Sequence, residues 1–108
     1  MEDLAPIEIN LNVSSKELNE SFLKTFGFLT KKLLRYIFGD VSIPVNIKGT
    51  PAQVTSFANA LSNEKRYMDS YLQNGLNDPR THASRQGLNR AVSSFERETG
   101  IKWPFKSW

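Results

Sequence analysis

The sequence predicts a helix-rich α+β fold with a small two-strand element and the order β-α-β-α-α. Two short segments alternate apolar and polar residues with the period of a strand, and three longer ones repeat apolar residues with the period of a helix. A glycine, a proline or a capping residue marks each boundary. The length of 108 residues, with 39% hydrophobic and 23% charged residues, fits a single domain over residues 1–108.

The first strand is predicted over residues 7–13, where every second residue is apolar. A helix is predicted to follow it, over about residues 15–38. Ser14 and Glu17 have the spacing of a capping box and indicate its beginning, and Gly39 indicates its end.

This helix has a broader apolar face than the core of one small domain requires. Because a chain of this size has limited interior, the surplus apolar area predicts contact with a partner or with another copy. Cations share the opposite face of the helix. The predicted contact residues are Phe22, Phe28, Leu34 and Phe38, and the cations are Lys24, Lys31 and Arg35.

The second strand is predicted over residues 41–48 from the same alternation. Pro44 cannot donate a ladder hydrogen bond, which favours a position at a sheet edge. The two strands either pair in parallel within one chain or pair with a second copy. The sequence leaves open whether residues 1–46 form a β-α oligomerisation or docking arm on a helical body of residues 47–108.

The second helix is predicted over residues 51–75, with a capping box formed by Thr50 and Gln53. The third is predicted over about residues 80–99 and ends at Gly100. The apolar faces are predicted to consist of Val54, Phe57, Ala58, Leu61, Met68, Tyr71 and Leu72 on the second helix, and of Leu88, Ala91, Val92 and Phe95 on the third.

The last residues are unusually aromatic. A Schellman motif at Gly100 would allow Ile101 to pack back onto Phe95. Trp103 and Phe105 alternate with polar residues, so we expect them to close the core. Trp108 has no following residue in this sequence and is the predicted contact with a partner, since tryptophan is enriched at binding hot spots.

Charge is unevenly distributed, although the net charge is only +3. Residues 1–23 hold five acids and one lysine, a charge of −4, whereas residues 24–48 hold five cations and one acid, a charge of +4. Residues 79–108 hold six cations and two acids, again +4. This distribution suits self-association or an anionic partner.

Several classes of function are excluded or disfavoured. The sequence contains no cysteine, so disulfides, thiolate metal sites and cysteine nucleophiles are excluded. His82 is the only histidine and has no serine at a catalytic spacing, and the acids do not share a helix face as metal ligands would. Glycine-rich phosphate-binding motifs do not occur. We therefore predict no catalytic residue, cofactor or metal, and no enzymatic activity.

Two further features concern location and an alternative function. No signal peptide or membrane-spanning segment is visible, which predicts a soluble protein. The alternative function is a small basic nucleic-acid-binding module, because the second and third helices could form a helix-turn-helix-like pair. Its candidate residues are Arg90 and Arg97, or Lys24, Lys31 and Arg35.

Four stretches, at residues 47–51, 64–67, 75–79 and 95–105, resemble small proteins of tailed bacteriophages. The resemblance covers about residues 47–105 and implies a virion or assembly component, located in the virion or the host cytoplasm. The favoured function is therefore a non-enzymatic structural or assembly protein that associates with itself or docks on a larger assembly. A phage-encoded inhibitor that docks on a host protein is a further alternative.

Overall fold

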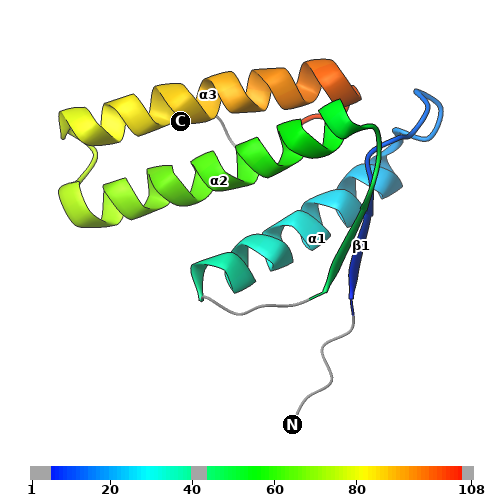
Figure 1. Ribbon diagram of the computed structural model, residues 1–108, viewed down its shortest axis with the longest axis horizontal. Helices are drawn as coiled ribbons and strands as arrows, with labels where there is room; N and C mark the ends of the chain where they lie inside the picture. The colour runs from blue at the N-terminus through cyan, green and yellow to red at the C-terminus, as the bar shows by residue number, and fades with distance from the viewer. Residues whose placement is uncertain (1–5, 40–43, 106–108) are drawn as a thin grey trace, which may run out of the picture.

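The computed structural model describes residues 6–39 and 44–105. α2 and α3 lie side by side, and α1 crosses one side of this pair with the two strands next to it (Figure 1). The predicted α+β class and element order are confirmed. The elements in chain order are β1 (Ile7–Asn10), α1 (Glu20–Phe38), β2 (Val45–Lys48), α2 (Pro51–Asn74) and α3 (Pro79–Thr99).

β1 and β2 pair in parallel within one chain, with Ile7 opposite Val45. Of the two pairings that the sequence allowed, this is the one observed. Pro44 directly precedes β2, and its carbonyl accepts a hydrogen bond from the backbone N–H of Ile7 at 3.0 Å. The proline therefore contributes an acceptor where its missing N–H is not needed. The alternating positions expected at residues 41–43 lie outside the described residues.

β1 is shorter than the predicted strand of residues 7–13. The backbone N–H of Leu11 still donates to the carbonyl of Lys48 at 2.7 Å, so the pairing extends one residue past β1. Beyond it, the side-chain oxygen of Asn10 accepts a hydrogen bond from the N–H of Asn12 at 3.1 Å. This local bond turns the chain and ends the ladder.

α1 begins later than predicted, and the start expected at Ser15 is wrong. The carboxylate of Glu17 accepts hydrogen bonds from the backbone N–H and the hydroxyl of Ser14, at 3.1 and 3.0 Å. These bonds close a single turn that does not continue into the helix. Asn19 caps α1 instead, because its side chain accepts a hydrogen bond from the N–H of Phe22 at 2.9 Å.

The caps predicted for α2 and for the end of α3 are confirmed. Thr50 and Gln53 form both bonds of a capping box, at 2.9 and 3.2 Å. Gly100 has a φ of +74°, and its N–H donates to the carbonyl of Glu96 at 2.9 Å. The following N–H, of Ile101, donates to a threonine hydroxyl at 3.0 Å. The helix therefore ends in the single-bond αL motif instead of the expected Schellman motif.

α2 and α3 form an antiparallel hairpin (Figure 1). Asp78 closes the turn between them and caps α3 by accepting a hydrogen bond from the N–H of Arg80 at 2.8 Å. The two helices run alongside one another, whereas the helices of a helix-turn-helix cross steeply. The predicted helix-turn-helix geometry is therefore wrong.

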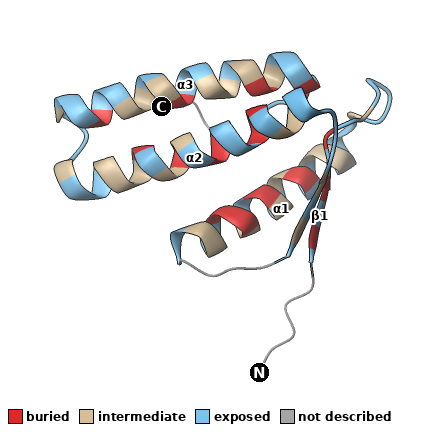
Figure 2. Ribbon diagram, viewed as in Figure 1, coloured by how far each residue is buried: buried red, intermediate tan, exposed pale blue. Residues whose placement is uncertain are grey.

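One core joins the helices, the strands and the tail (Figure 2). The ring of Phe26 in α1 stacks on Phe95 in α3, with centroids 5.9 Å apart, and lies 6.0 Å from Phe57 in α2. Trp103 packs edge-on against Phe57 and Phe95, and Phe105 packs edge-on against Trp103. The prediction that Trp103 and Phe105 close the fold is confirmed.

The second half of α2 is less buried than its apolar pattern predicts. Besides Ala58, which is exposed in the first half of the helix, Tyr71 is 40% exposed and Leu72 is 71% exposed in the second half. α1 and α2 diverge toward this end of α2, so α1 does not cover it (Figure 1). Glu64 and Tyr67, which were not predicted to be in the core, are buried.

Candidate functional site

The side of α1 that faces away from the core carries exposed aromatic rings together with cations. Phe28 is 66% exposed and Phe38 is 40% exposed, both unusual for phenylalanine in a small domain. We call this side the outer face of α1. Its charged residues are Lys24, Lys31 and Arg35, all exposed, and the half-buried Lys32.

A shallow hollow of about 290 Å³ lies on this outer face. The ring of Phe28 lines it together with Lys31, Lys32 and Arg35, and Tyr36 completes it. An apolar ring is thus surrounded by three cations. A surface of this kind favours a partner that offers apolar area and negative charge together.

A groove of about 400 Å³ lies next to the hollow, between α1, α2 and the C-terminal tail. Leu34 and Phe38 form its wall on α1, Met68 forms its wall on α2, and Phe105 contributes from the tail. We call it the apolar groove. The remaining residues that line it are Lys31, Arg35 and Glu64.

The structure divides the predicted contact residues into two groups. Phe28 and Phe38 are exposed, as expected. The expectation that Leu34 belongs to the surplus surface is wrong, because Leu34 is only 6% exposed and belongs to the core. Phe22 is half-buried, and its ring stacks on Phe26 with centroids 6.1 Å apart. Leu34 therefore reaches a partner only as the floor of the apolar groove, and most of the Phe22 ring is inside.

A buried carboxyl lies beneath the apolar groove. Glu64 is 4% exposed, and its Oε1 accepts a hydrogen bond from the indole Nε1 of Trp103 at 2.9 Å. Burial raises the pKa of Glu64, and the hydrogen bond from Trp103 opposes part of that increase. The bond also fixes the indole, which positions the neighbouring Phe105 in the wall of the groove.

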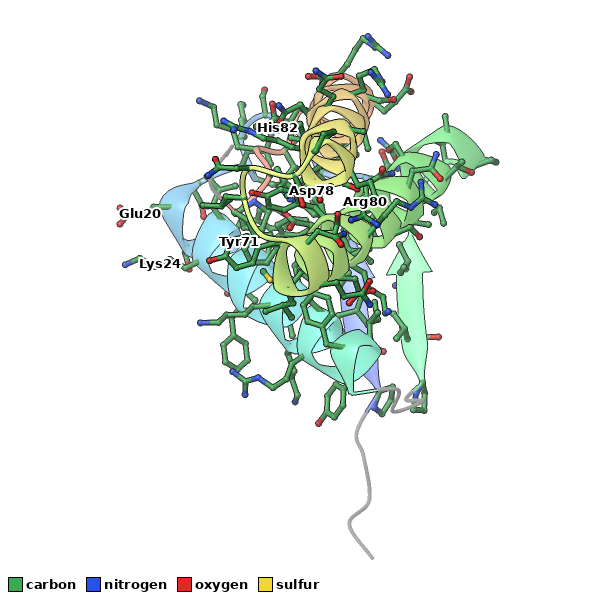
Figure 3. All side chains as sticks on the ribbon, turned by 90° about the vertical axis from the view of Figure 1, so that its left-hand side faces the viewer. Glu20, Lys24, Tyr71, Asp78, Arg80 and His82 are labelled. Atoms are coloured by element: carbon green, nitrogen blue, oxygen red, sulfur yellow. The ribbon has the colours of Figure 1, made fainter. Side chains whose placement is uncertain are left out.

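The cations around the apolar groove and the adjoining hollow are exposed or half-buried. Among the described residues, no carboxylate forms an ion pair with Lys31, Lys32 or Arg35. Lys24 does pair with Glu20 at 3.4 Å near the beginning of α1, where both side chains point away from the body (Figure 3). Because that pair is exposed, it contributes little to stability. On α1, the cations without an ion-pair partner among the described residues therefore lie beside the apolar groove and the adjoining hollow.

Other predicted site residues lie elsewhere. Arg90 and Arg97 line polar hollows of the α2–α3 hairpin that include no residue of α1. The structure thus does not bring the two sets of predicted nucleic-acid residues together. Trp108 lies outside the described residues.

Sequence reasoning missed the contribution of Glu64, Met68 and Phe105 to the apolar groove. Glu64 lies three residues after Leu61 and four before Met68, which is the spacing of a buried helix face. That spacing was the available signal for its burial. Its partner, Trp103, is 39 residues away in the chain, so no local pattern could have identified the hydrogen bond.

The described residues place limits on other kinds of site. Within residues 6–39 and 44–105, no three His, Cys, Asp or Glu side chains are grouped to hold a metal ion. No helix in the same part of the chain is long and apolar enough to cross a membrane. Comparison of the chain with protein-family models, curated proteins and solved structures finds no match. The outer face of α1 and the apolar groove are therefore interpreted from their own geometry.

Proposed function

We propose that this chain is a non-enzymatic assembly protein whose copies dock on one another through the apolar groove. The observation that supports this function is the combination of an apolar floor with the unpaired cations Lys31 and Arg35, beside the exposed rings of Phe28 and Phe38. Exposed apolar area bordered by charge is typical of protein interaction sites.

The charge of the outer face disfavours a contact between two copies of the same face. Such a symmetric contact would place Lys31, Lys32 and Arg35 opposite the same residues of the second copy. Like charges across an interface cost several kcal/mol unless they are separated or neutralised. The contact must therefore join two different surfaces, with the acidic surface on the neighbouring copy.

The segment of the sequence with matching chemistry is at residues 1–5, outside the described residues. Glu2 and Asp3 there supply two negative charges, and Leu4 supplies an apolar side chain. Of the two other segments outside the described residues, 106–108 carries Trp108 but also Lys106, a further cation for a cationic rim, and 40–43 carries a single acid, Asp40. Charge complementarity therefore favours the acidic segment as the occupant.

A contact of this kind repeats from copy to copy. Each chain offers one acidic segment and one apolar groove, so each copy binds two neighbours through different surfaces. Contacts of this type close into a ring or continue as an open filament. Both outcomes fit the virion or assembly role that the resemblance to phage proteins implies.

Exchanging the charges on the two surfaces tests this function. One variant carries Glu2→Lys and Asp3→Lys, and the other carries Lys31→Glu and Arg35→Glu. Each variant alone has like charges on both surfaces, so we expect its association to weaken by about tenfold or more. An equal mixture restores opposite charges at every contact and should recover the wild-type solution mass in analytical ultracentrifugation.

The mixture is its own control for folding, because a variant that had unfolded could not recover association. A mixture that is no heavier than its separate components would contradict the proposed contact. So would a wild-type chain that remains a monomer at every concentration, since the acidic segment would then not be joining copies.

A further inference from the structure

A second surface, along the α2–α3 hairpin, does not depend on the proposed assembly function. Three polar hollows follow one another along the α2–α3 hairpin, with volumes of about 520, 410 and 410 Å³. Arg66 and Ser84 line both the first and the second hollow, and Arg90 lines both the second and the third. The hollows therefore adjoin one another, the first two between α2 and α3 and the third along α3 alone, and together we call them the hairpin channel.

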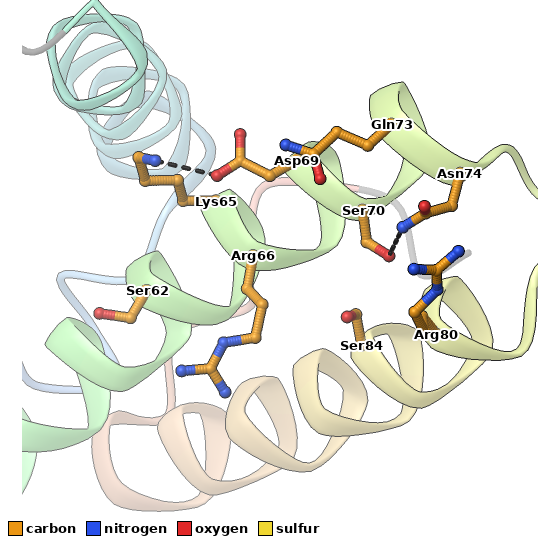
Figure 4. A pocket seen from close by; sticks show the side chains of 9 residues that line it. All are labelled: Ser62, Lys65, Arg66, Asp69, Ser70, Gln73, Asn74, Arg80 and Ser84. Atoms are coloured by element: carbon orange, nitrogen blue, oxygen red, sulfur yellow. Dashed lines mark hydrogen bonds and ion pairs between the residues drawn. The ribbon is translucent and has the colours of Figure 1, made fainter.

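Side chains from both helices enter the hairpin channel. Arg66 points from α2 toward α3, and Arg80 and Ser84 point from α3 toward α2 (Figure 4). The helices approach closely at Gly87, where an added Cβ would lie 3.0 Å from the Oδ1 of Asn63. The absence of a side chain at Gly87 keeps the floor of the channel low between the arginines.

The positive charge of the channel is only partly neutralised. Lys65 is paired with Asp69 at 2.9 Å, and Arg80 is paired with Asp78 at 3.0 Å. In the part of the chain that the structure describes, no carboxylate forms an ion pair with Arg66, Arg90 or Arg97.

Two of the arginines on α3 that form no ion pair with a described carboxylate are aligned along the helix axis. Arg90 and Arg97 are seven residues apart, which places them on one side of the helix about 10 Å from one another. Glu96 and Glu98 flank Arg97 in the sequence, but neither lines the channel, whose described lining holds five cations and one acid.

The lining of the channel indicates the chemistry of its ligand. Nearly every described side chain that lines the three hollows carries a polar or charged group, which favours a polar, anionic ligand over an apolar peptide or lipid chain. Guanidinium groups bind phosphate oxygens through two parallel hydrogen bonds. Serine hydroxyls and asparagine amides, at Ser84, Ser94 and Asn89, supply further donors along the same path.

From this arrangement we infer that the hairpin channel binds the phosphate backbone of a single-stranded nucleic acid. Between α2 and α3 the channel has Arg66 on one wall and Arg80 and Arg90 on the other, and beyond them it continues along α3 alone. A flexible single strand can follow this path, whereas a stiff duplex would contact only its edges. None of the described residues that line the channel has an aromatic side chain on which a base could stack. Binding is therefore electrostatic, independent of base sequence and strongly dependent on salt.

The test measures fluorescence anisotropy of a labelled oligothymidylate of about twelve nucleotides, at salt concentrations from about 50 mM upward. Wild-type protein should bind it, and Arg66→Gln with Arg90→Gln should weaken binding by about tenfold at the lowest salt. Because each lost phosphate contact contributes about −0.7 to the slope of log K against log salt, the slope should become shallower by about 1.4.

The matched control is Lys16→Gln with Lys48→Gln, which also removes two positive charges, both from exposed side chains outside the hairpin channel and the proposed docking surface. We expect this variant to change binding by less than about twofold, and circular dichroism to show that both variants fold. Equal weakening by the two variants would overturn the inference, because binding would then follow net charge alone. The absence of binding at low salt, an equally tight complex with a duplex, or full competition by polyglutamate of the same length would each overturn it as well.

Discussion

At the scale of single residues, the hydrogen bond between Glu64 and Trp103 leads to the clearest predictions about stability. It joins α2 to the tail, and both residues are buried. A carboxylate in such a place is costly when charged, and an indole N–H is costly when unpaired. The hydrogen bond therefore satisfies the indole N–H of Trp103, but it requires the carboxyl group of Glu64 to be buried.

Glu64→Gln tests how the buried carboxyl group makes the free energy of unfolding depend on pH. The pKa of Glu64 is raised in the folded chain. At a pH just above the ordinary pKa of 4.5, the folded chain therefore keeps a proton on this carboxyl group that the unfolded chain has released. The free energy of unfolding therefore falls as pH rises from that value through the raised pKa. Glutamine still accepts the bond from Trp103 but does not titrate. Urea denaturation should show Glu64→Gln gaining stability relative to wild type as pH rises, and levelling off above the raised pKa.

A second substitution separates the charge from the hydrogen bond. Glu64→Leu removes the acceptor and leaves the Trp103 N–H unpaired, which should lower stability by about 1–3 kcal/mol relative to Glu64→Gln at every pH. A difference between wild type and Glu64→Gln that stays constant with pH would show that Glu64 is not a buried titrating group.

At the scale of elements, Gly27 weakens α1 without a conformational reason in its surroundings. Its backbone does not need a positive φ, and an added Cβ would lie 3.4 Å from the Cβ of Pro104, which is ordinary contact. Alanine has a helix propensity about 1 kcal/mol better than glycine. Gly27→Ala should therefore raise the free energy of unfolding by up to about 1 kcal/mol, as measured by urea denaturation.

The matched control for this prediction is Gly100→Ala. Gly100 has a φ of +74° in the left-handed region, where a Cβ costs about 1 kcal/mol. The two substitutions should therefore act in opposite directions. A loss of stability in Gly27→Ala would show that the tail at Pro104 cannot accommodate even one added methyl group.

The sequence predicted elements well where local bonds decide them. Thr50 with Gln53, and Gly100, have short-range partners that fix the beginning of α2 and the end of α3. Ser14 and Glu17 have the same local signature, yet their bonds close only one turn before Asn19 begins α1. Local spacing identifies the bonds but not the length of helix that follows them.

At the scale of the whole molecule, exposed apolar area gathers at two places. One is the outer face of α1 and the apolar groove, where Phe28 and Phe38 are exposed. The other is the end of α2 and the turn after it, where Leu72 and Leu76 are 71% and 53% exposed. The first place is bordered by cations that form no ion pair with another described residue, and for this reason it is the proposed docking surface.

The candidate site was predictable only in part, because long-range packing decides it. Periodicity identified Phe28 and Phe38 together with the cations of α1. It could not show that Leu34 turns into the core, or that Met68 and Phe105 arrive from other elements to complete the apolar groove. It also could not distinguish an antiparallel hairpin from a crossed pair of helices, since both need the same apolar faces.

The most direct test of the assembly function is the solution mass of the full chain, measured by light scattering across a concentration series at low and at high salt. If copies dock through the apolar groove, the mass rises with concentration. High salt weakens the association, because charge contributes to the contact. Leu4→Asp should remain a monomer although it adds an acid, because the apolar groove would lose its apolar occupant. A wild-type mass equal to one chain at every concentration and salt, or a Leu4→Asp variant that associates as wild type does, would contradict the proposed function.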